Sequence, residues 1–260
     1  MLTPMRWQFL ICLLVFLAIT LPRAIALPSI VSPAKKEVAQ QIEALSLRQS
    51  CRMFGDCDVV LSAAGIKMTV KKSGLVCLLL PPYKEVICYS KSSGKIYRTP
   101  FNKFRNCFST SMTLFSFTLE DVKLKPAGNA EKFGMVLHKF ESTDAFVKEQ
   151  QARYKKHETS GGSPFKLFYL GSNQLKYDSN QGLMMERLYA LPRVGMFPIS
   201  VDYKSAEGTH VSYLITAKVL KTTVPVSEFA IPANLKTAKE MQETLESGSS
   251  DEAMQLMMGK

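Results

Sequence analysis

Apolar residues recur along this chain in short alternating runs separated by turn residues, a pattern that is typical of antiparallel strands. In the first half the runs fall between residues 59 and 97, with Gly, Ser or Pro pairs between them. The predicted strands are 59–61, 66–70, 75–80, 85–89 and 95–97. Because the connecting turns are short, these strands form an antiparallel meander.

The second half of the chain is also predicted to be mostly strand. In its longest run Val211, Tyr213 and Ile215 face one side, while Ser212 and Thr216 face the other. Strands are expected at 113–119, 133–139, 166–170, 182–189, 197–203 and 210–220, with 229–232 closing the sheet.

Three segments carry helical signals. Ser32-Pro33 precedes apolar residues at helical spacing and predicts an amphipathic helix over 32–49. Ser142-Thr143-Asp144 caps a second helix that ends near residue 157, and 235–246 form a short third one. Residues 98–110 form a basic, aromatic loop. The fold class is α+β, a large and strongly twisted antiparallel sheet with a few helices covering one face.

The first 26 residues have the pattern of a secretory signal peptide. Arg6 precedes an apolar run over 10–19, and the segment ends in Ala24-Ile25-Ala26. The run is shorter than the roughly 20 residues that cross a bilayer. We expect cleavage after Ala26, a single domain over 27–235, and a C-terminal helix with a flexible acidic tail over 236–260; the alternative is an uncleaved membrane anchor.

The chain is strongly basic, with a net charge of +11. Cleavage would remove Arg6 and Arg23 and no acidic residue, leaving +9. Basic residues concentrate between 58 and 118, where Lys67, Lys71 and Lys72 are candidate contacts to anionic head groups, polyanions or an acidic partner. The alternative is a basic face that only confers solubility. Nucleic acid is not expected as a partner of an exported chain without a binding motif.

Five cysteines follow the expected cleavage site: Cys51, Cys57, Cys77, Cys88 and Cys107. An exported protein can form disulfides, and an odd count leaves one thiol over. A tight turn at 81–84 would place Cys77 and Cys88 opposite each other, which permits a cross-strand disulfide. A Cys51–Cys57 disulfide is the other pairing considered. The spacings fit neither a redox motif nor a zinc site.

The chain carries no recognisable catalytic motif. His138, His157 and His210 are not at metal-ligand spacing, and the sequence has no nucleophile elbow, phosphate loop or dinucleotide fingerprint. We therefore expect a non-enzymatic protein without catalytic residues, metal or cofactor. The positive signal is a concentration of aromatic and Met residues in the strand segments, which suits either core packing or a cavity for an irregular apolar ligand.

The second half is similar to the LolA-like superfamily of periplasmic lipoprotein-sorting carriers. The closest matches are Gly195-Met-Phe-Pro198 before a strand and the terminal run Val224-Pro to Phe229-Ala-Ile-Pro232. The resemblance implies an incomplete β-barrel whose concave face, covered by helices, holds acyl chains. It also implies an arginine on that face, for which Arg187 is the nearest candidate by position.

The expected function is therefore an exported, periplasmic or secreted carrier or binding protein for a lipid or another amphiphile. The alternative is a protein-interaction module of the same fold that acts through its basic surface. The candidate ligand contacts are Phe115, Phe117, Phe168, Met185, Arg187, Ile199 and Tyr213.

Overall fold

The computed structural model describes residues 40–106, 119–156, 165–175 and 177–245. The chain divides into two compact units, Met1–Val38 and Ala39–Lys260, and every described residue belongs to the second. No helix among these residues is long and apolar enough to cross a membrane.

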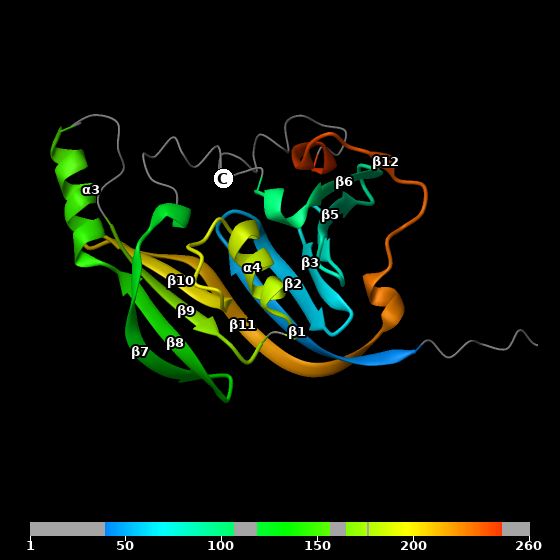
Figure 1. Cartoon of the computed structure of the whole chain (residues 1–260), viewed down its shortest axis with the longest axis horizontal. Coiled ribbons are helices and arrows are strands. Elements are labelled where there is room, and N and C mark those ends of the chain that lie inside the picture. The colour runs from blue at the N-terminus through cyan, green and yellow to red at the C-terminus, as the bar shows by residue number, and fades with distance from the viewer. Residues whose placement is uncertain (1–39, 107–118, 157–164, 176, 246–260) are drawn as a thin grey trace, which may run out of the picture. The chain divides into compact units, whose positions relative to one another are not determined.

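In the described part of the chain, twelve strands form one open sheet, antiparallel except for a parallel pair at one edge (Figure 1). The strands are β1 (Gln41–Cys51), β2 (Gly55–Ser62), β3 (Gly65–Val70), β4 (Leu75–Leu79), β5 (Glu85–Ser90), β6 (Lys95–Pro100), β7 (Leu124–Lys132), β8 (Met135–Ser142), β9 (Phe165–Ser172), β10 (Phe197–Ser205), β11 (His210–Pro225) and β12 (Lys236–Thr237). Their order across the sheet is β12-β6-β5-β4-β3-β2-β1-β11-β10-β9-β8-β7. This open, curved sheet with few helices confirms the predicted α+β class.

Two α-helices accompany the sheet in the described residues, α3 (Asp144–Lys156) and α4 (Ser179–Leu188). Helix α4 packs on β10 and lies across the central strands in Figure 1. The helix backbone lies close to the segment that leads into β10, since a Cβ added at Gly182 would lie 3.1 Å from the backbone of Met196. Short 3-10 helices complete the structure: η2 (Phe101–Lys103), η4 (Leu119–Asp121), η5 (Val226–Phe229) and η6 (Met241–Thr244).

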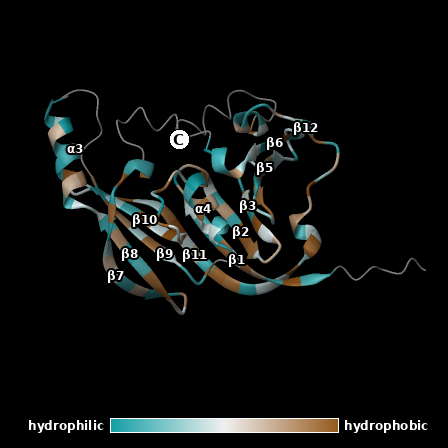
Figure 2. Cartoon of the chain, viewed as in Figure 1, coloured by the Kyte–Doolittle hydropathy of each residue, from teal (hydrophilic) through white to brown (hydrophobic). Residues whose placement is uncertain are grey.

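Each face of the meander is apolar and each is covered. On β4, Leu75, Cys77 and Leu79 join the main core, while Val76 and Leu78 join a second cluster on the opposite face. We call the face toward the main core, which α4 covers, the inner face, and the other the outer face. Apolar residues therefore run continuously along β4 and β5 instead of alternating. Figure 2 shows the hydropathy of each residue over the whole sheet.

The outer face of β3 to β6 is covered by the first part of the C-terminal segment, residues 226–235, while Met241 and Leu245 of the same segment pack against the main core. Its Phe229, Ile231 and Leu235 pack against the second cluster. Its Glu228 carboxylate lies 2.6 Å from the Lys67 ammonium, and β12 pairs with β6. The segment therefore finishes a sheet surface that the meander alone would leave exposed.

Most predicted strands are confirmed, and three predictions are wrong. Residues 41–49 of the predicted 32–49 helix lie in β1, because Leu47, Gln49 and Cys51 alternate toward the core and pair with β11. The predicted strand 182–189 is the helix α4, which begins at an Asp178 cap. Residues 229–232 do not close the sheet; η5 ends at Phe229 and packs on its outer face.

Of the remaining elements, some were predicted correctly and others were shortened or missed. The helix expected after Ser142-Thr143-Asp144 is α3, and the tight turn at 81–84 joins β4 and β5. The short helix expected over 235–246 is reduced to η6, and β7 was not predicted. The predicted strand 113–119 lies outside the described residues except for Leu119, which begins η4. In the predicted loop 98–110, residues 98–100 instead end β6 and residues 101–103 form η2, while 107–110 lie outside the described residues.

Candidate functional site

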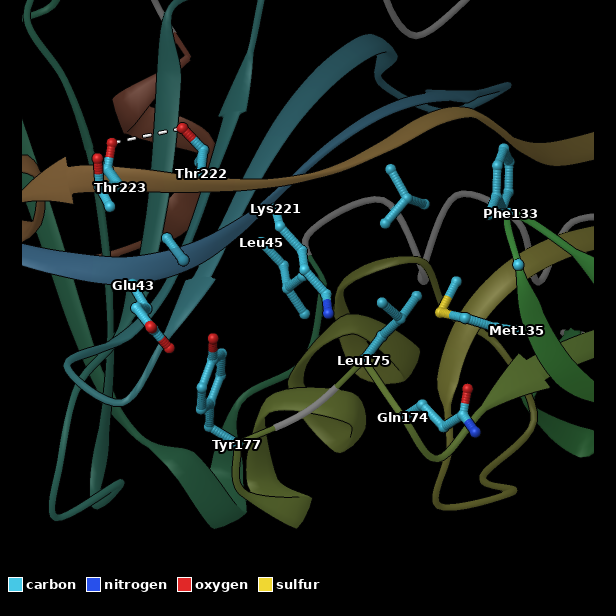
Figure 3. A pocket seen from close by; sticks show the side chains of 13 residues that line it. Glu43, Leu45, Phe133, Met135, Gln174, Leu175, Tyr177, Lys221, Thr222 and Thr223 are labelled. Atoms are coloured by element: carbon cyan, nitrogen blue, oxygen red, sulfur yellow. Dashed lines mark hydrogen bonds between the residues drawn. The ribbon is translucent and has the colours of Figure 1, made fainter.

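A groove of about 1120 Å³ opens on the inner side of the sheet, where β1 and β11 extend as a paired arm. Its walls come from this arm, from the turn between β7 and β8, and from the loop between β9 and α4 (Figure 3). The volume is slightly above the roughly 300–1,000 Å³ that ligand pockets usually occupy.

The floor of the groove is apolar and continues the main core. Leu45, Phe133, Met135 and Val219 are only partly buried and pack against that core, and Leu175 is buried beside them. In the groove, protein side chains thus leave part of the inner face uncovered. Such a concave apolar surface is the usual setting of a site for an apolar ligand.

The register of the arm decides which side chains face the groove. Leu45 lies opposite Lys221 and Leu47 opposite Val219, so alternate residues of both strands point to the inner face. The same alternation directs Leu220 to the outer face, where its side chain is 45% exposed.

The turn between β7 and β8 brings an aromatic ring to the opposite wall. Lys132 pairs with Met135, and the two residues between them, Phe133 and Gly134, have φ of 56° and 69°. Two central residues with positive φ are the requirement of a tight type I′ hairpin. A non-glycine residue in this conformation is uncommon, and here it lines the groove.

The polar lining lies mainly on one side of the groove. Figure 3 shows Glu43 and Tyr177 together on one side, Phe133 and Met135 on the other, and Lys221 with Leu45 and Leu175 between them. The further polar lining residues are Gln174, Thr222 and Thr223. The groove is therefore amphipathic along its length.

The third wall is held in place by hydrogen bonds around the start of α4. The Ser172 hydroxyl accepts a bond from the Gln174 N–H, and the Asp178 carboxylate accepts one from the Asn180 N–H. Gln181, on the first turn of α4, accepts a bond from the Tyr177 N–H and donates to the Ser62 carbonyl. These bonds fix Leu175 and Tyr177 against the groove.

The structure places the sequence-predicted ligand contacts elsewhere. Met185, Ile199 and Tyr213 are buried in the main core, and the Tyr213 hydroxyl donates to the Tyr189 carbonyl. Phe168 is half-buried on β9, and Arg187 is half-buried at the end of α4. Phe115 and Phe117 lie outside the described residues. None of the five described side chains lines the groove.

The three predicted head-group lysines have different environments. Lys67 pairs with Glu228 and also donates to its carbonyl oxygen at 3.1 Å. The Lys71 ammonium lies 3.5 Å from the Asp58 carboxylate, and Lys72 is exposed in the turn after β3. The groove does not include any of them.

Sequence reasoning missed the groove because its residues are ordinary when read one by one. Leu45 and Val219 are strand residues whose partners lie far away in the sequence, and Lys221 is one lysine among many. The available signal was Phe133-Gly134, a glycine-containing two-residue turn between strands.

The described cysteines are buried thiols, and no disulfide joins Cys51, Cys57, Cys77 or Cys88. Cys77 and Cys88 lie directly opposite each other as predicted, with 3.4 Å between their sulfur atoms. Burial raises the pKa of Cys51 to about 11 and that of Cys57 to about 12, so both are protonated at neutral pH. Among the described residues no group of three His, Cys, Asp or Glu could hold a metal ion.

Comparison with known proteins gives matches in structure only. No protein-family model and no curated protein matches the sequence. An uncharacterized conserved protein from Thermus thermophilus is similar in structure, with TM-score 0.38 and 11% identity over 77% of this chain and 91% of that one. The Mycobacterium tuberculosis lipoprotein LppX follows, with TM-score 0.27 and 9% identity over 71% and 86%.

A putative outer membrane lipoprotein-sorting protein domain from Vibrio parahaemolyticus also matches, with TM-score 0.23 and 9% identity over 70% of this chain and 85% of that one. At these TM-scores the matches assign no ligand.

Proposed function

We propose that this protein is an exported, non-enzymatic binding or carrier protein for a lipid or a similar amphiphile, and that the groove is its binding site. The observation that carries the proposal is an open groove of about 1120 Å³ whose apolar floor is continuous with the main core. Export rests on the signal-peptide pattern of residues 1–26.

The floor explains why an apolar chain would enter. Leu45, Met135 and Val219 keep part of their apolar surface in water, and covering it with a ligand removes that surface from water. Each methylene group buried in this way contributes about 0.8 kcal/mol. A chain of several methylenes therefore gains enough free energy to offset the cost of being immobilised.

The polar side of the groove explains why the ligand would be an amphiphile and not a hydrocarbon. Glu43, Tyr177 and Thr223 gather at the side away from Phe133. A polar head group there keeps its hydrogen bonds while the apolar chain lies over Leu45 and Val219. The Lys221 ammonium between the two regions favours a head group with an acidic oxygen.

The proposal is tested by titrating the full chain with a fluorescent fatty acid and comparing two neighbouring substitutions on β11. Val219→Trp places a large ring in the groove, whereas Leu220→Trp places the same ring on the exposed outer face. We expect Val219→Trp to weaken binding about tenfold or more, since losing two buried methylenes costs about 1.6 kcal/mol.

The Leu220→Trp variant should bind like the unmodified chain. Met135→Trp, with Val136→Trp as its exposed control, repeats the comparison from the opposite wall. The proposal is wrong if the unmodified chain shows no saturable binding, or if the groove variants and their controls bind equally well.

A further inference from the structure

Three arginines gather at the C-terminal end of α4, away from the groove lining. Arg187 belongs to the last turn of that helix. Arg193 lies in the following turn, which is tied back to the helix by the Leu191 N–H bond to the Glu186 carbonyl. Arg105 directly precedes Asn106, whose side chain donates to the carbonyl of Leu188. Segments from two parts of the chain thus place Arg105 and Arg193 next to the end of α4, near enough for both charges to act on Arg187.

Arg187 is held firmly by neutral groups. Its guanidinium carbon lies 4.7 Å from the centre of the Phe101 ring, and the same group donates a hydrogen bond to the Phe101 carbonyl. Its Nε atom is buried and has no hydrogen-bond partner among the described residues. The side chain is therefore fixed in position with an unused donor.

The charges around Arg187 are unbalanced. Within the described residues, neither it nor Arg105 nor Arg193 forms an ion pair with a carboxylate. Burial first, and then the like charges of Arg193 and Arg105, lower the pKa of Arg187, which only Glu120 opposes. Placing like charges around a half-buried cation is unfavourable unless something neutralises them.

The helix end alone does not account for the cluster. The C-terminus of α4 carries a partial negative charge that favours nearby cations. That effect is only a fraction of one charge and falls off within one turn, whereas three full positive charges meet here. Among the described residues no ion-paired carboxylate neutralises these charges, and a bound anion would do so.

We propose that Arg105, Arg187 and Arg193 form a binding site for a phosphate-type oxyanion, distinct from the amphiphile groove. Guanidinium groups donate paired hydrogen bonds that match the oxygen geometry of phosphate. Arg187, already oriented by Phe101, provides the fixed donor, and the two exposed arginines close over the anion. The anion is either free phosphate or the phosphate of a lipid head group.

The test uses the full chain with two probes, inorganic phosphate and vesicles of phosphatidylglycerol in phosphatidylcholine. The double variant Arg105→Gln/Arg193→Gln removes two exposed charges, and Lys204→Gln/Lys218→Gln removes two exposed charges elsewhere as a matched control. We expect saturable, salt-sensitive binding of at least one probe, weakened at least tenfold in the arginine variant but not in the control.

Binding of inorganic phosphate would identify a free anion, and binding of vesicles alone would identify a lipid head group. Equal losses in the two double variants would overturn the proposal, because they would show only an effect of net charge. Absence of saturable binding of both probes would also overturn it. The Val219→Trp variant should bind the probe normally, so this site and the groove can fail independently.

Discussion

At the scale of single residues, the buried carboxyl of Glu186 organises the turn that follows α4. Its Oε1 atom accepts hydrogen bonds from the N–H groups of Val194, Gly195 and Met196 and from the Tyr169 hydroxyl. The side chain is fully buried, and Oε2 has no partner among the described residues. One oxygen therefore satisfies the backbone of the turn that leads into β10.

Removing that oxygen should destabilise the protein strongly. Glu186→Ala leaves three N–H donors without their acceptor, and each buried unsatisfied group costs about 1–3 kcal/mol. We expect the free energy of unfolding to fall by about 3 kcal/mol or more, measured by urea denaturation. Glu186→Gln keeps one acceptor oxygen and should cost clearly less; equal losses in the two variants would contradict this role.

The same carboxyl should make stability depend on pH. Burial raises the pKa of Glu186 above its usual 4.5, and the hydrogen bonds to Val194, Met196, Tyr169 and Gly195 oppose the shift. The folded state thus holds the proton more tightly than the unfolded chain, so this contribution to stability is lost as pH rises through the raised pKa.

A glutamine at this position cannot ionise. The difference in unfolding free energy between the unmodified chain and Glu186→Gln should therefore shrink as pH rises above about 4.5. Denaturation curves at several pH values measure it. A difference that grows with pH would show that the carboxylate, and not the neutral acid, is the favoured form in the fold.

At the scale of elements, the success of sequence reasoning depended on how local the signal was. The meander from β2 to β6 was predictable because its apolar runs and turns are consecutive. Pairing of β1 with β11 was not, since nothing near Gln41 indicates a partner at Pro225. Without that pairing, the spacing of Ile42 and Leu45 suggests a helix.

Helix α4 was mistaken for a strand because its local sequence pattern is ambiguous. Its run from Gly182 to Tyr189 is short and apolar, and such a run fits a buried strand or a buried helix equally well. The deciding local signal was Asp178, whose side chain caps the helix. The helix covers the inner face, so this one error also hid how the core is filled.

The pairing of β4 with β5 leads to a prediction about oxidation. The Cys77 and Cys88 sulfur atoms are only 3.4 Å apart. Exchange with oxidised glutathione during refolding should therefore join them in a disulfide, and their two hydrogens leave on two molecules of reduced glutathione. A loop of this size gains about 3 kcal/mol from a disulfide. Peptide mapping should find the Cys77–Cys88 link and a raised Tm.

Two variants make that experiment specific. Cys77→Ser should abolish the link, while Cys57→Ser should leave it intact, because Cys57 lies opposite Gln49 and not opposite a cysteine. Recovery of only reduced Cys77 and Cys88 after oxidative refolding would contradict the prediction.

At the scale of the whole described unit, two layers cover the sheet, and they have different origins. The inner face is covered by α4 and its neighbouring turns, and the outer face of the meander by the C-terminal segment. Near the arm of β1 and β11 the inner face stays open. The position of the groove is thus a consequence of what the rest of the chain covers.

The C-terminal segment should contribute substantially to stability. Phe229 is buried against the outer cluster, so Phe229→Ala should lower the free energy of unfolding by about 3 kcal/mol. Val226 belongs to the same 3-10 helix but is 40% exposed, and Val226→Ala should change stability little. Thermal unfolding compares the two, and equal shifts in Tm would mean that the segment does not hold the outer face.

The central claim is that the groove holds an amphiphile, and native mass spectrometry of the full chain expressed in an exporting host tests it most directly. We predict an adduct of one lipid-sized molecule per chain that extracts into organic solvent, and that is depleted in Val219→Trp but retained in Leu220→Trp. A ligand-free mass for the folded, unmodified chain, unchanged after incubation with lipid, would contradict the claim.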